Sequence, residues 1–138
     1  MRFGAINPTV IEQFRGGHEI DAVPGVTRQD HILLTTVGRR SGEPRTVPLR
    51  IFREEGNRLI VVAGNGGEPA HPAWYLNLLA APRATVETDK ETYEIEATVL
   101  SGEDRAALWA LFHEQHPGMS EYLAGADRVV PVVALTRI

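Results

Sequence analysis

Short β-rich runs separated by turn residues are the feature of this chain that most constrains its fold. Six such runs lie at residues 32–37, 45–53, 58–63, 84–88, 92–100 and 129–136. Pro48 interrupts the second run, and residues typical of turns fill the gaps between the runs. A length of 138 residues is enough for one hydrophobic core. We therefore expect one mainly β (α+β) domain over residues 1–138, a barrel of about six strands with short flanking helices.

Helices are expected at four places between these runs. The first follows Asn7-Pro8, runs to Arg15 and ends at two glycines. The second covers residues 72–81, and a further helical turn covers residues 119–123. Between them, Ser101 is expected to cap a helix, with Asp104 three residues on. The core-facing stripe of that helix would comprise Ala107, Leu108, Leu111 and Phe112.

Composition and charge exclude several classes of function. The chain has no cysteine, which rules out disulfides, thiolate catalysis and cysteine-based metal sites. Its net charge of −4 argues against a nucleic-acid partner. No apolar run is long enough for an integral membrane segment, and no signal peptide is visible, so we expect a cytoplasmic location. His113 and His116 lie three apart, but no further ligands accompany them, and no metal is expected.

An arginine-rich turn is the strongest local signal. Five arginines fall within fifteen residues, and the segment from Gly38 to Arg45 combines glycines, Ser41 and three of them. Glycines let a backbone approach an anion closely, and guanidinium groups bind phosphate in a bidentate manner. The segment is equally compatible with an exposed hairpin whose arginines are merely solvated.

Two further segments offer groups for ligand binding. Residues 64–67 hold three glycines in four residues, directly after an expected strand. Their spacing matches neither a dinucleotide fingerprint nor a phosphate-binding P-loop, and a simple flexible connection is as good an interpretation. Trp74 and Asn77 lie three apart, which places them on one helical face. Trp74 offers a stacking surface and Asn77 offers a donor and an acceptor, although Trp74 could equally belong to the core.

Taken together, these motifs resemble one family. LTTVGRRSG (34–42), PR (44–45), PL (48–49), VAGNGG (62–67), PAWYLNL (72–78) and PVV (131–133) with Leu135 occur in the order and spacing of the deazaflavin-dependent nitroreductases of actinobacteria. The resemblance runs from about Ile32 to the C-terminus. It implies a split β-barrel like that of FMN-binding reductases. It also implies an enzyme that transfers a hydride from reduced coenzyme F420 to a small electron-poor acceptor, such as a quinone, an enone or a nitroaromatic compound.

The resemblance also implies roles for particular residues. F420 carries a phosphodiester and a polyglutamate tail, so the arginine-rich turn gains an anionic partner. The cofactor's phosphate or tail would contact Arg39, Arg40, Ser41, Gly42 and Arg45. Its ring and ribityl chain would lie against Pro48, Ala63, Gly64, Asn65, Gly66, Gly67, Trp74 and Asn77.

The acceptor would bind near Arg50, His116, Met119 and Tyr122, by the same resemblance. Relatives place an aromatic residue at the position of Arg50, and tyrosines at those of His116 and Met119, so the acceptor itself stays open. If a side chain donates a proton, Tyr122 or His116 is the catalytic candidate. Two alternatives remain: an FMN-dependent reductase of the same barrel class, and a non-catalytic deazaflavin carrier. Barrels of this class often pair, so a homodimer is possible.

Overall fold

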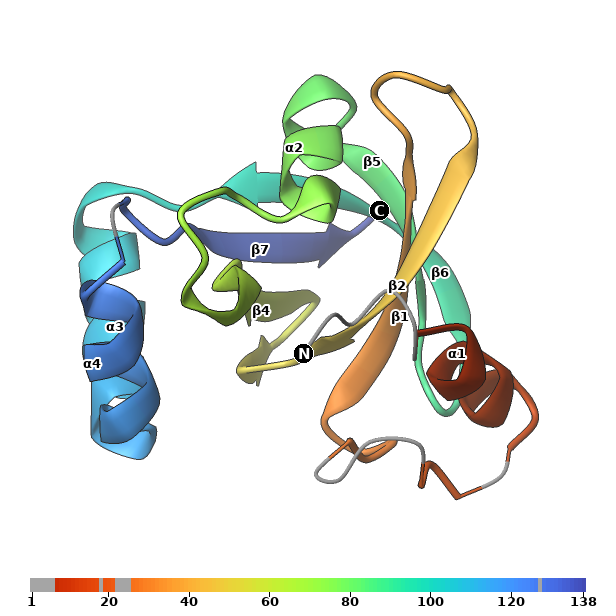
Figure 1. Ribbon diagram of the computed structural model, residues 1–138, viewed down its shortest axis with the longest axis horizontal. Coiled ribbons are helices and arrows are strands. Elements are labelled where there is room, and N and C mark those ends of the chain that lie inside the picture. The colour runs from red at the N-terminus through yellow and green to blue at the C-terminus, as the bar shows by residue number, and fades with distance from the viewer. Residues whose placement is uncertain (1–6, 18, 22–25, 127) are drawn as a thin grey trace.

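A seven-stranded antiparallel sheet forms the centre of the protein (Figure 1). The computed structural model describes residues 7–17, 19–21, 26–126 and 128–138. Within these, the strand order is β2-β1-β5-β6-β7-β4-β3. The strands are β1 (His31–Val37), β2 (Pro44–Arg50), β3 (Arg53–Glu55), β4 (Arg58–Val62), β5 (Arg83–Glu87), β6 (Thr92–Val99) and β7 (Val132–Arg137). The mainly β fold predicted from the sequence is confirmed, with one strand more than expected.

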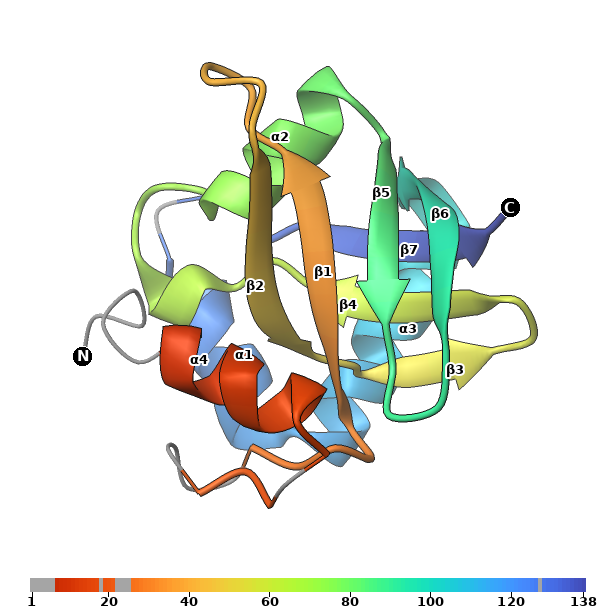
Figure 2. The same cartoon turned by 90° about the vertical axis from the view of Figure 1, so that its right-hand side faces the viewer.

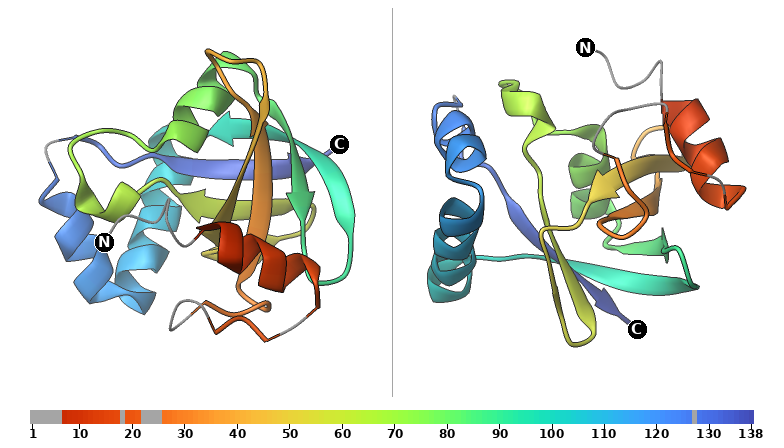
Figure 3. Two further views of the ribbon diagram at one scale, coloured as in Figure 1. Left: turned by 45° about the vertical axis from the view of Figure 1, so that its right-hand side comes forward. Right: turned by 90° about the horizontal axis from the view of Figure 1, so that it is seen from below.

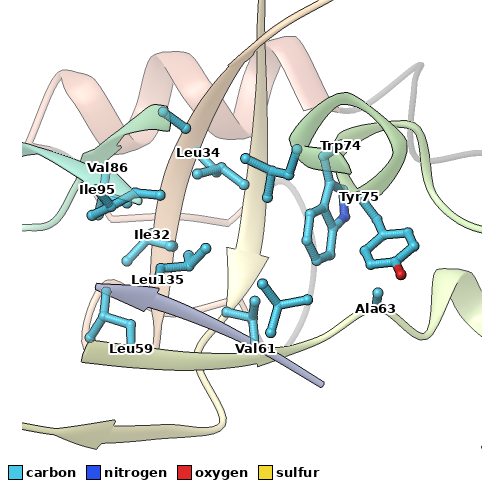
Figure 4. Close-up of a cluster of buried hydrophobic side chains, with 13 residues drawn as sticks. Ile32, Leu34, Leu59, Val61, Ala63, Trp74, Tyr75, Val86, Ile95 and Leu135 are labelled. Carbon is cyan, nitrogen blue, oxygen red and sulfur yellow. The ribbon is translucent and has the colours of Figure 1, made fainter. Parts of the chain in front are cut away.

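The sheet curls into a half-barrel around the main hydrophobic core. Figure 2 shows β1, β2 and β5 lying across β3, β4 and β7, with β6 joining the two groups. In β6, Ile95 and Glu96 pair with β5 on one side and with β7 on the other. Side chains from both groups of strands meet inside the curl (Figure 4). The curl therefore closes over one shared core, as a split barrel requires.

Strand β1 is buried on both faces, which explains its unbroken apolar run. Ile32 and Leu34 point into the barrel core, whereas Leu33 packs with Val10 and Phe14 of α1 (Asn7–Arg15). The alternation of side chains along a strand puts these residues on opposite faces. Helix α1 thus covers the outside of the barrel at β1, and it is the helix expected from Asn7-Pro8.

The second expected strand ends at a corner and not at Pro48, and β3 includes Glu54 and Glu55, which were expected in a turn. The chain stays in β2 through Pro48, which an edge strand tolerates because its missing N–H faces no partner. At the corner, Ile51 N–H donates to Asp30 O (2.7 Å) and Phe52 N–H donates to Ile60 O (2.9 Å). The chain therefore changes partner from β1 to β4 between these two residues, and β3 begins as the additional strand.

The remaining helices are α2 (Ala73–Ala80), α3 (Gly102–Gln115), α4 (Pro117–Ala124) and the short 3₁₀ turn η2 (Asn65–Gly67). Helices α3 and α4 pack side by side at one end of the barrel, opposite α1 (Figure 3). Leu108 and Phe112 of α3 are buried and Leu111 is partly buried, but Ala107 is exposed, so the expected core stripe was one residue too wide. Ser101 holds the N-cap position without a side-chain hydrogen bond, contrary to expectation, because its hydroxyl does not reach the free amides.

Helix α2 lies along one rim of the half-barrel, and this position builds the site described below. Trp74 and Tyr75 point from α2 toward Val61 and Ala63 at the end of β4 (Figure 4). Both rings are largely buried, with 7% and 8% of their surfaces exposed. Helix α2 is thus anchored by two aromatic side chains. Among the residues the structure describes, no helix has the length and apolarity needed to cross a membrane.

Candidate functional site

The hairpin between β1 and β2 carries the arginine cluster at its tip, next to one end of α2 (Figure 2). Two backbone bonds of 2.8 Å close the tip, from Gly38 N–H to Glu43 O and from Gly42 N–H to Gly38 O. A Cβ atom added at Gly38 would lie 2.6 Å from Ser41 Oγ. The tip therefore needs glycine at position 38, because any larger residue would push Ser41 out of place.

Ser41 and Arg45 are joined inside this hairpin. Ser41 Oγ accepts hydrogen bonds from the Glu43 amide (3.2 Å) and from Arg45 Nη2 (3.4 Å). The side chains of Arg39, Arg40 and Arg45 are exposed, and Asp or Glu forms no ion pair with them within the described residues. Three guanidinium groups without carboxylate partners keep their full charge available for an anionic ligand.

Asn77 of α2 ties the helix to the arginine-rich hairpin. Its Oδ1 accepts two hydrogen bonds of 3.2 Å from Arg39, one from the backbone amide and one from Nη1. Its Nδ2 donates to Thr36 Oγ1 at 2.9 Å. Asn77 and Thr36 are only 3% and 2% exposed. The amide is therefore committed to holding Arg39 in place, a role that the spacing of Trp74 and Asn77 alone did not reveal.

A pocket of about 480 Å³ lies between the hairpin and α2. This volume lies within the range of small-molecule sites. Six of the predicted site residues line it, namely Arg39, Arg40, Ser41, Arg45, Trp74 and Asn77. Six others were not predicted individually, although Gly38 and Pro44 belong to the arginine-rich segment; they are Thr36, Gly38, Pro44, Thr46, Val47 and Ala73. Thr36 could have been found from the strand register of the hairpin, since it lies directly opposite Arg45 in the β1–β2 pairing.

The glycine-rich loop forms a second group of predicted site residues. Asn65 Nδ2 donates to Ala70 O at 2.9 Å, and the backbone of Asn65 has a positive φ of 47°. Helix α4 packs on this loop: a Cβ atom added at Gly67 would lie 2.6 Å from Cε1 of Tyr122. A Cβ atom added at Gly64 would lie 3.0 Å from Leu123 Cδ2. Gly64 and Gly67 are thus explained by a close approach of α4.

The predicted acceptor residues lie on different elements of the fold. His116 precedes α4, and its ring packs against Phe112 and Phe52, with centroids 5.6 and 6.3 Å away. Met119 and Tyr122 lie within α4, and Tyr122 is 63% exposed beside the glycine-rich loop. His116 thus stands at the junction of α3 and α4, and only Met119 and Tyr122 lie three apart inside one helix.

Arg50 lies at the end of β2 away from the arginine-rich hairpin. Its Nη2 pairs with Asp30 Oδ2 at 3.3 Å, and Asp30 Oδ1 lies 2.6 Å from His31 Nδ1. Partial burial acts to raise the pKa of Asp30, but hydrogen bonds from Thr27 and His31 outweigh it, and the pKa lies below its usual value. Asp30 is therefore held as a carboxylate beside Arg50.

His113 has a structural contact and, among the described residues, does not belong to a metal site. His113 Nδ1 lies 2.5 Å from Ser120 Oγ, which in turn donates to Pro117 O at 3.1 Å, so this histidine links α3 to α4. Over residues 7–17, 19–21, 26–126 and 128–138, no three histidine or carboxylate side chains gather as a metal site would require.

The curled sheet and the arginine-lined pocket beside Trp74 define a class of protein, the split barrels with a pocket suited to an anionic ligand. Comparison with known proteins gives the family. The family model described as F420H2-dependent quinone reductase matches residues 9–137. The chain belongs to the F420H2-dependent quinone reductase family.

Individual relatives agree with this assignment. An F420H2-dependent quinone reductase of Mycobacterium tuberculosis (strain H37Rv) is 32% identical over 126 residues, which span 89% of this chain and 80% of the relative. The solved structure of an F420-H2 Dependent Reductase (FDR-A) is 37% identical, with a TM-score of 0.66 over 78% of this chain and 94% of that one. A structure described as a domain-swapped dimer is 36% identical, with a TM-score of 0.68 over 93% and 92% of the two chains.

These findings confirm four predictions made from the sequence. The family resemblance is correct, and the fold is a split-barrel type with short helices. The protein is an oxidoreductase, an F420H2-dependent reductase. The roles predicted for individual residues are a separate matter and stay predictions.

Proposed function

We propose that this protein binds reduced F420 in the pocket between the β1–β2 hairpin and α2, and that it reduces a small quinone. Membership of the F420H2-dependent quinone reductase family carries the reaction class. The arginine-lined pocket carries the location. When bound, the cofactor supplies a hydride, and one further proton completes the two-electron reduction of a quinone to a hydroquinone.

The chemistry of the pocket fits the anionic half of the cofactor. Arg39, Arg40 and Arg45 present guanidinium groups that no carboxylate among the described residues neutralises. Gly42 completes the turn, and the Ser41 hydroxyl remains able to donate its own proton while it accepts from Arg45. Phosphate oxygens accept such bonds with good geometry, and in the protein each charge-assisted bond contributes about 1.5–3 kcal/mol.

The ring half of the cofactor is assigned to the surface that leads from Trp74 toward the glycine-rich loop. Trp74 lines the pocket but is only 7% exposed, so it offers a small contact area to the ring. Pro48 on β2 and residues 63–67 complete this proposed surface. Asn77 contributes by holding Arg39, since its amide is already bonded on both sides.

The acceptor is assigned to the side of the glycine-rich loop that α4 covers. Tyr122 combines an exposed ring with a hydroxyl, and it lies against Gly67. Met119 adds an exposed apolar surface on the same helix. Tyr122 is the first candidate for a proton donor. His116 and Arg50 are also proposed to lie near the acceptor. Their side chains already have partners in the protein, since His116 packs on phenylalanines and Arg50 pairs with Asp30.

A titration followed by turnover assays tests this function. Purified protein is titrated with oxidised F420 and with FMN, and the fluorescence of each ligand reports binding. Reduced F420 is then offered with a panel of quinones, enones and nitroaromatic compounds, and its oxidation is followed by absorbance. Tighter binding of F420 than of FMN, with turnover of a quinone, supports the proposal. Preference for FMN would assign the protein to the FMN-dependent reductases, and F420 binding without turnover would make it a carrier.

Oligomeric state is part of the same proposal. The 36% identical relative described as a domain-swapped dimer favours a homodimer here. Light scattering coupled to size-exclusion chromatography gives the mass directly, and a single species near 15.2 kDa would refute the dimer.

A further inference from the structure

Arg128 makes the most extensive set of hydrogen bonds to the glycine-rich loop. Its Nη2 donates to the carbonyl oxygens of Gly64 (2.9 Å) and Ala63 (3.1 Å), and its Nε donates to Glu68 O at 3.1 Å. Its Nη1 lies 2.9 Å from Nδ1 of His71. One guanidinium group thus connects the segment between α4 and β7 to both ends of the loop and to the residue that precedes α2 by two positions.

The contact with His71 fixes the state of that ring. A guanidinium group can only donate hydrogen bonds, so His71 Nδ1 must be the acceptor. A neutral ring that accepts at Nδ1 carries its proton on Nε2. The same ring packs against Tyr75 of α2, with centroids 4.9 Å apart. Arg128 therefore orders His71, and His71 in turn contacts one of the two aromatic anchors of α2.

The loop needs such a device because its own sequence gives it little rigidity. Three of its four residues are glycines, which have the greatest backbone freedom in the unfolded chain. Within the described backbone, the loop is held by its two short turns, Gly67 N–H to Gly64 O and Glu68 N–H to Asn65 O. A guanidinium group that bonds the loop carbonyls from outside adds a restraint to these turns, to the Asn65 bond and to the packing of α4.

We propose that Arg128 is a positioning residue for the reductase: it holds the glycine-rich loop and His71 in the arrangement against which the cofactor ring is bound. The proposal rests on the proposed function, which assigns the ring to this loop. Arg128 itself acts through the loop carbonyls and has no assigned contact with cofactor or acceptor. Its removal should free the loop and lower the affinity for F420.

The matched control is Arg105→Ala. Arg105 also donates to a backbone carbonyl, Val130 O at 2.7 Å, and it lines the same small cavity of about 230 Å³ as Arg128. It lies over the ring of Trp109, 5.0 Å from the centroid, and none of its bonds reaches the glycine-rich loop. The two variants remove the same charge from the same neighbourhood.

The experiment has one readout that does not need the cofactor. Hydrogen exchange, measured by mass spectrometry on residues 63–68, should be faster in Arg128→Ala than in the parent and unchanged in Arg105→Ala. Binding of F420 should weaken about tenfold in Arg128→Ala only, the lower end of what one charge-assisted interaction contributes. Millimolar guanidinium chloride should restore affinity in Arg128→Ala, and sodium chloride of equal strength should not.

Each outcome decides between two readings. Exchange and affinity that match those of Arg105→Ala would overturn the proposal, and so would faster exchange with unchanged affinity. A parent protein that does not bind F420 refutes the proposed function instead, while the exchange data still report on the loop. If Arg128→Ala does not fold, Arg128→Lys decides, because it keeps the positive charge and loses the planar group that bonds three carbonyl oxygens at once. Faster exchange of residues 63–68 and weaker F420 binding in Arg128→Lys support the role of Arg128, and unchanged values overturn it.

Discussion

Replacing Asn77 with Asp separates the positioning role of this residue from its presence in the pocket. The aspartate side chain has almost the same shape, and its oxygens still accept both hydrogen bonds from Arg39. Thr36 can reverse its bond and donate its hydroxyl proton to the second oxygen. The geometry of the hairpin is therefore retained, while one negative charge enters a pocket that is proposed to bind an anion.

The expected effect on binding follows from the charge. Two like charges about 8 Å apart repel by about 2 kcal/mol at an effective dielectric constant of about 20, which lowers the affinity by about thirtyfold. The new carboxylate also pairs with Arg39 and takes part of its charge away from the ligand. Asn77→Asp should therefore weaken F420 binding by one to two orders of magnitude, roughly, and the loss should shrink as salt rises.

Asn77→Ala should behave differently, because it removes the bonds and adds no charge. The buried hydroxyl of Thr36 loses its partner, which costs about 1–3 kcal/mol of folding free energy. Arg39 keeps its charge but loses its fixed position, so binding weakens less than in Asn77→Asp, by about tenfold or less. Asn77→Ala should thus be the less stable of the two variants, and Asn77→Asp should bind F420 more weakly.

Urea unfolding and fluorescence titration with F420, at low and high salt, measure both quantities. Asn57→Asp is the matched control, since Asn57 is exposed in the turn between β3 and β4, and the change of charge is the same. A folded Asn77→Asp variant that binds F420 as tightly as the parent would refute the reasoning and remove the anionic group from this pocket.

Four further predictions follow from the same structure. Replacing Arg39 and Arg40 together with Ala should leave the protein folded and weaken F420 binding at least tenfold, with less salt dependence than the parent in the same titration; unchanged affinity would return the hairpin to a solvated turn. Gly67→Ala should lower the free energy of unfolding by about 1–3 kcal/mol in urea, since the backbone has a φ of 80° and the new methyl group meets Tyr122; a neutral effect would contradict the close packing of α4. Tyr122→Phe should leave F420 affinity unchanged and lower kcat more than it raises the KM of the quinone if the hydroxyl donates the proton; the reverse pattern would reduce it to shaping the pocket. The lowered pKa of Asp30 stabilises the fold above the usual carboxyl pKa, so Asp30→Asn should be less stable than the parent at neutral pH, and this difference should vanish as the pH falls through that lowered value; a difference that persists at low pH would mean that the charge is not responsible.

The fold could be predicted largely because its signals are local. Turn residues and β-rich runs mark strands wherever they pair, and Asn7-Pro8 marks the start of a helix in any context. The additional strand was missed because the corner at Ile51 and Phe52 depends on backbone bonds to Asp30 of an earlier segment and to Ile60 of the next strand. The strand itself also gave no signal, since Glu54 and Glu55 lie in a segment whose composition is typical of a turn.

In the candidate site too, residues that are close in the sequence could be predicted, and those that depend on tertiary contacts could not. Arg39, Arg40, Ser41 and Arg45 could be grouped because they lie on one hairpin and carry one kind of chemistry. Residues that act by contact across the fold were beyond local reasoning. Asn77 was placed in the pocket, but its commitment to Arg39 and Thr36 needs the approach of α2 to the hairpin. Arg128 has no motif of its own and is recognisable only by what its guanidinium group touches.

The arginines of the pocket should contribute unequally to the affinity for the cofactor. The arginines that would contact the ligand are exposed and have long side chains with many rotamers, whereas Asn77 is buried. An exposed arginine loses side-chain entropy when it grips a ligand, and a guanidinium already held by a buried amide loses less. The guanidinium of Arg39 is hydrogen-bonded to Asn77, whereas that of Arg40 has no such partner among the described residues. Arg39 should therefore contribute more to the affinity for F420 than Arg40, although their charges are equal. Single alanine variants of the two, titrated with F420 under the same conditions, compare these contributions directly, and equal losses would mean that charge alone determines binding.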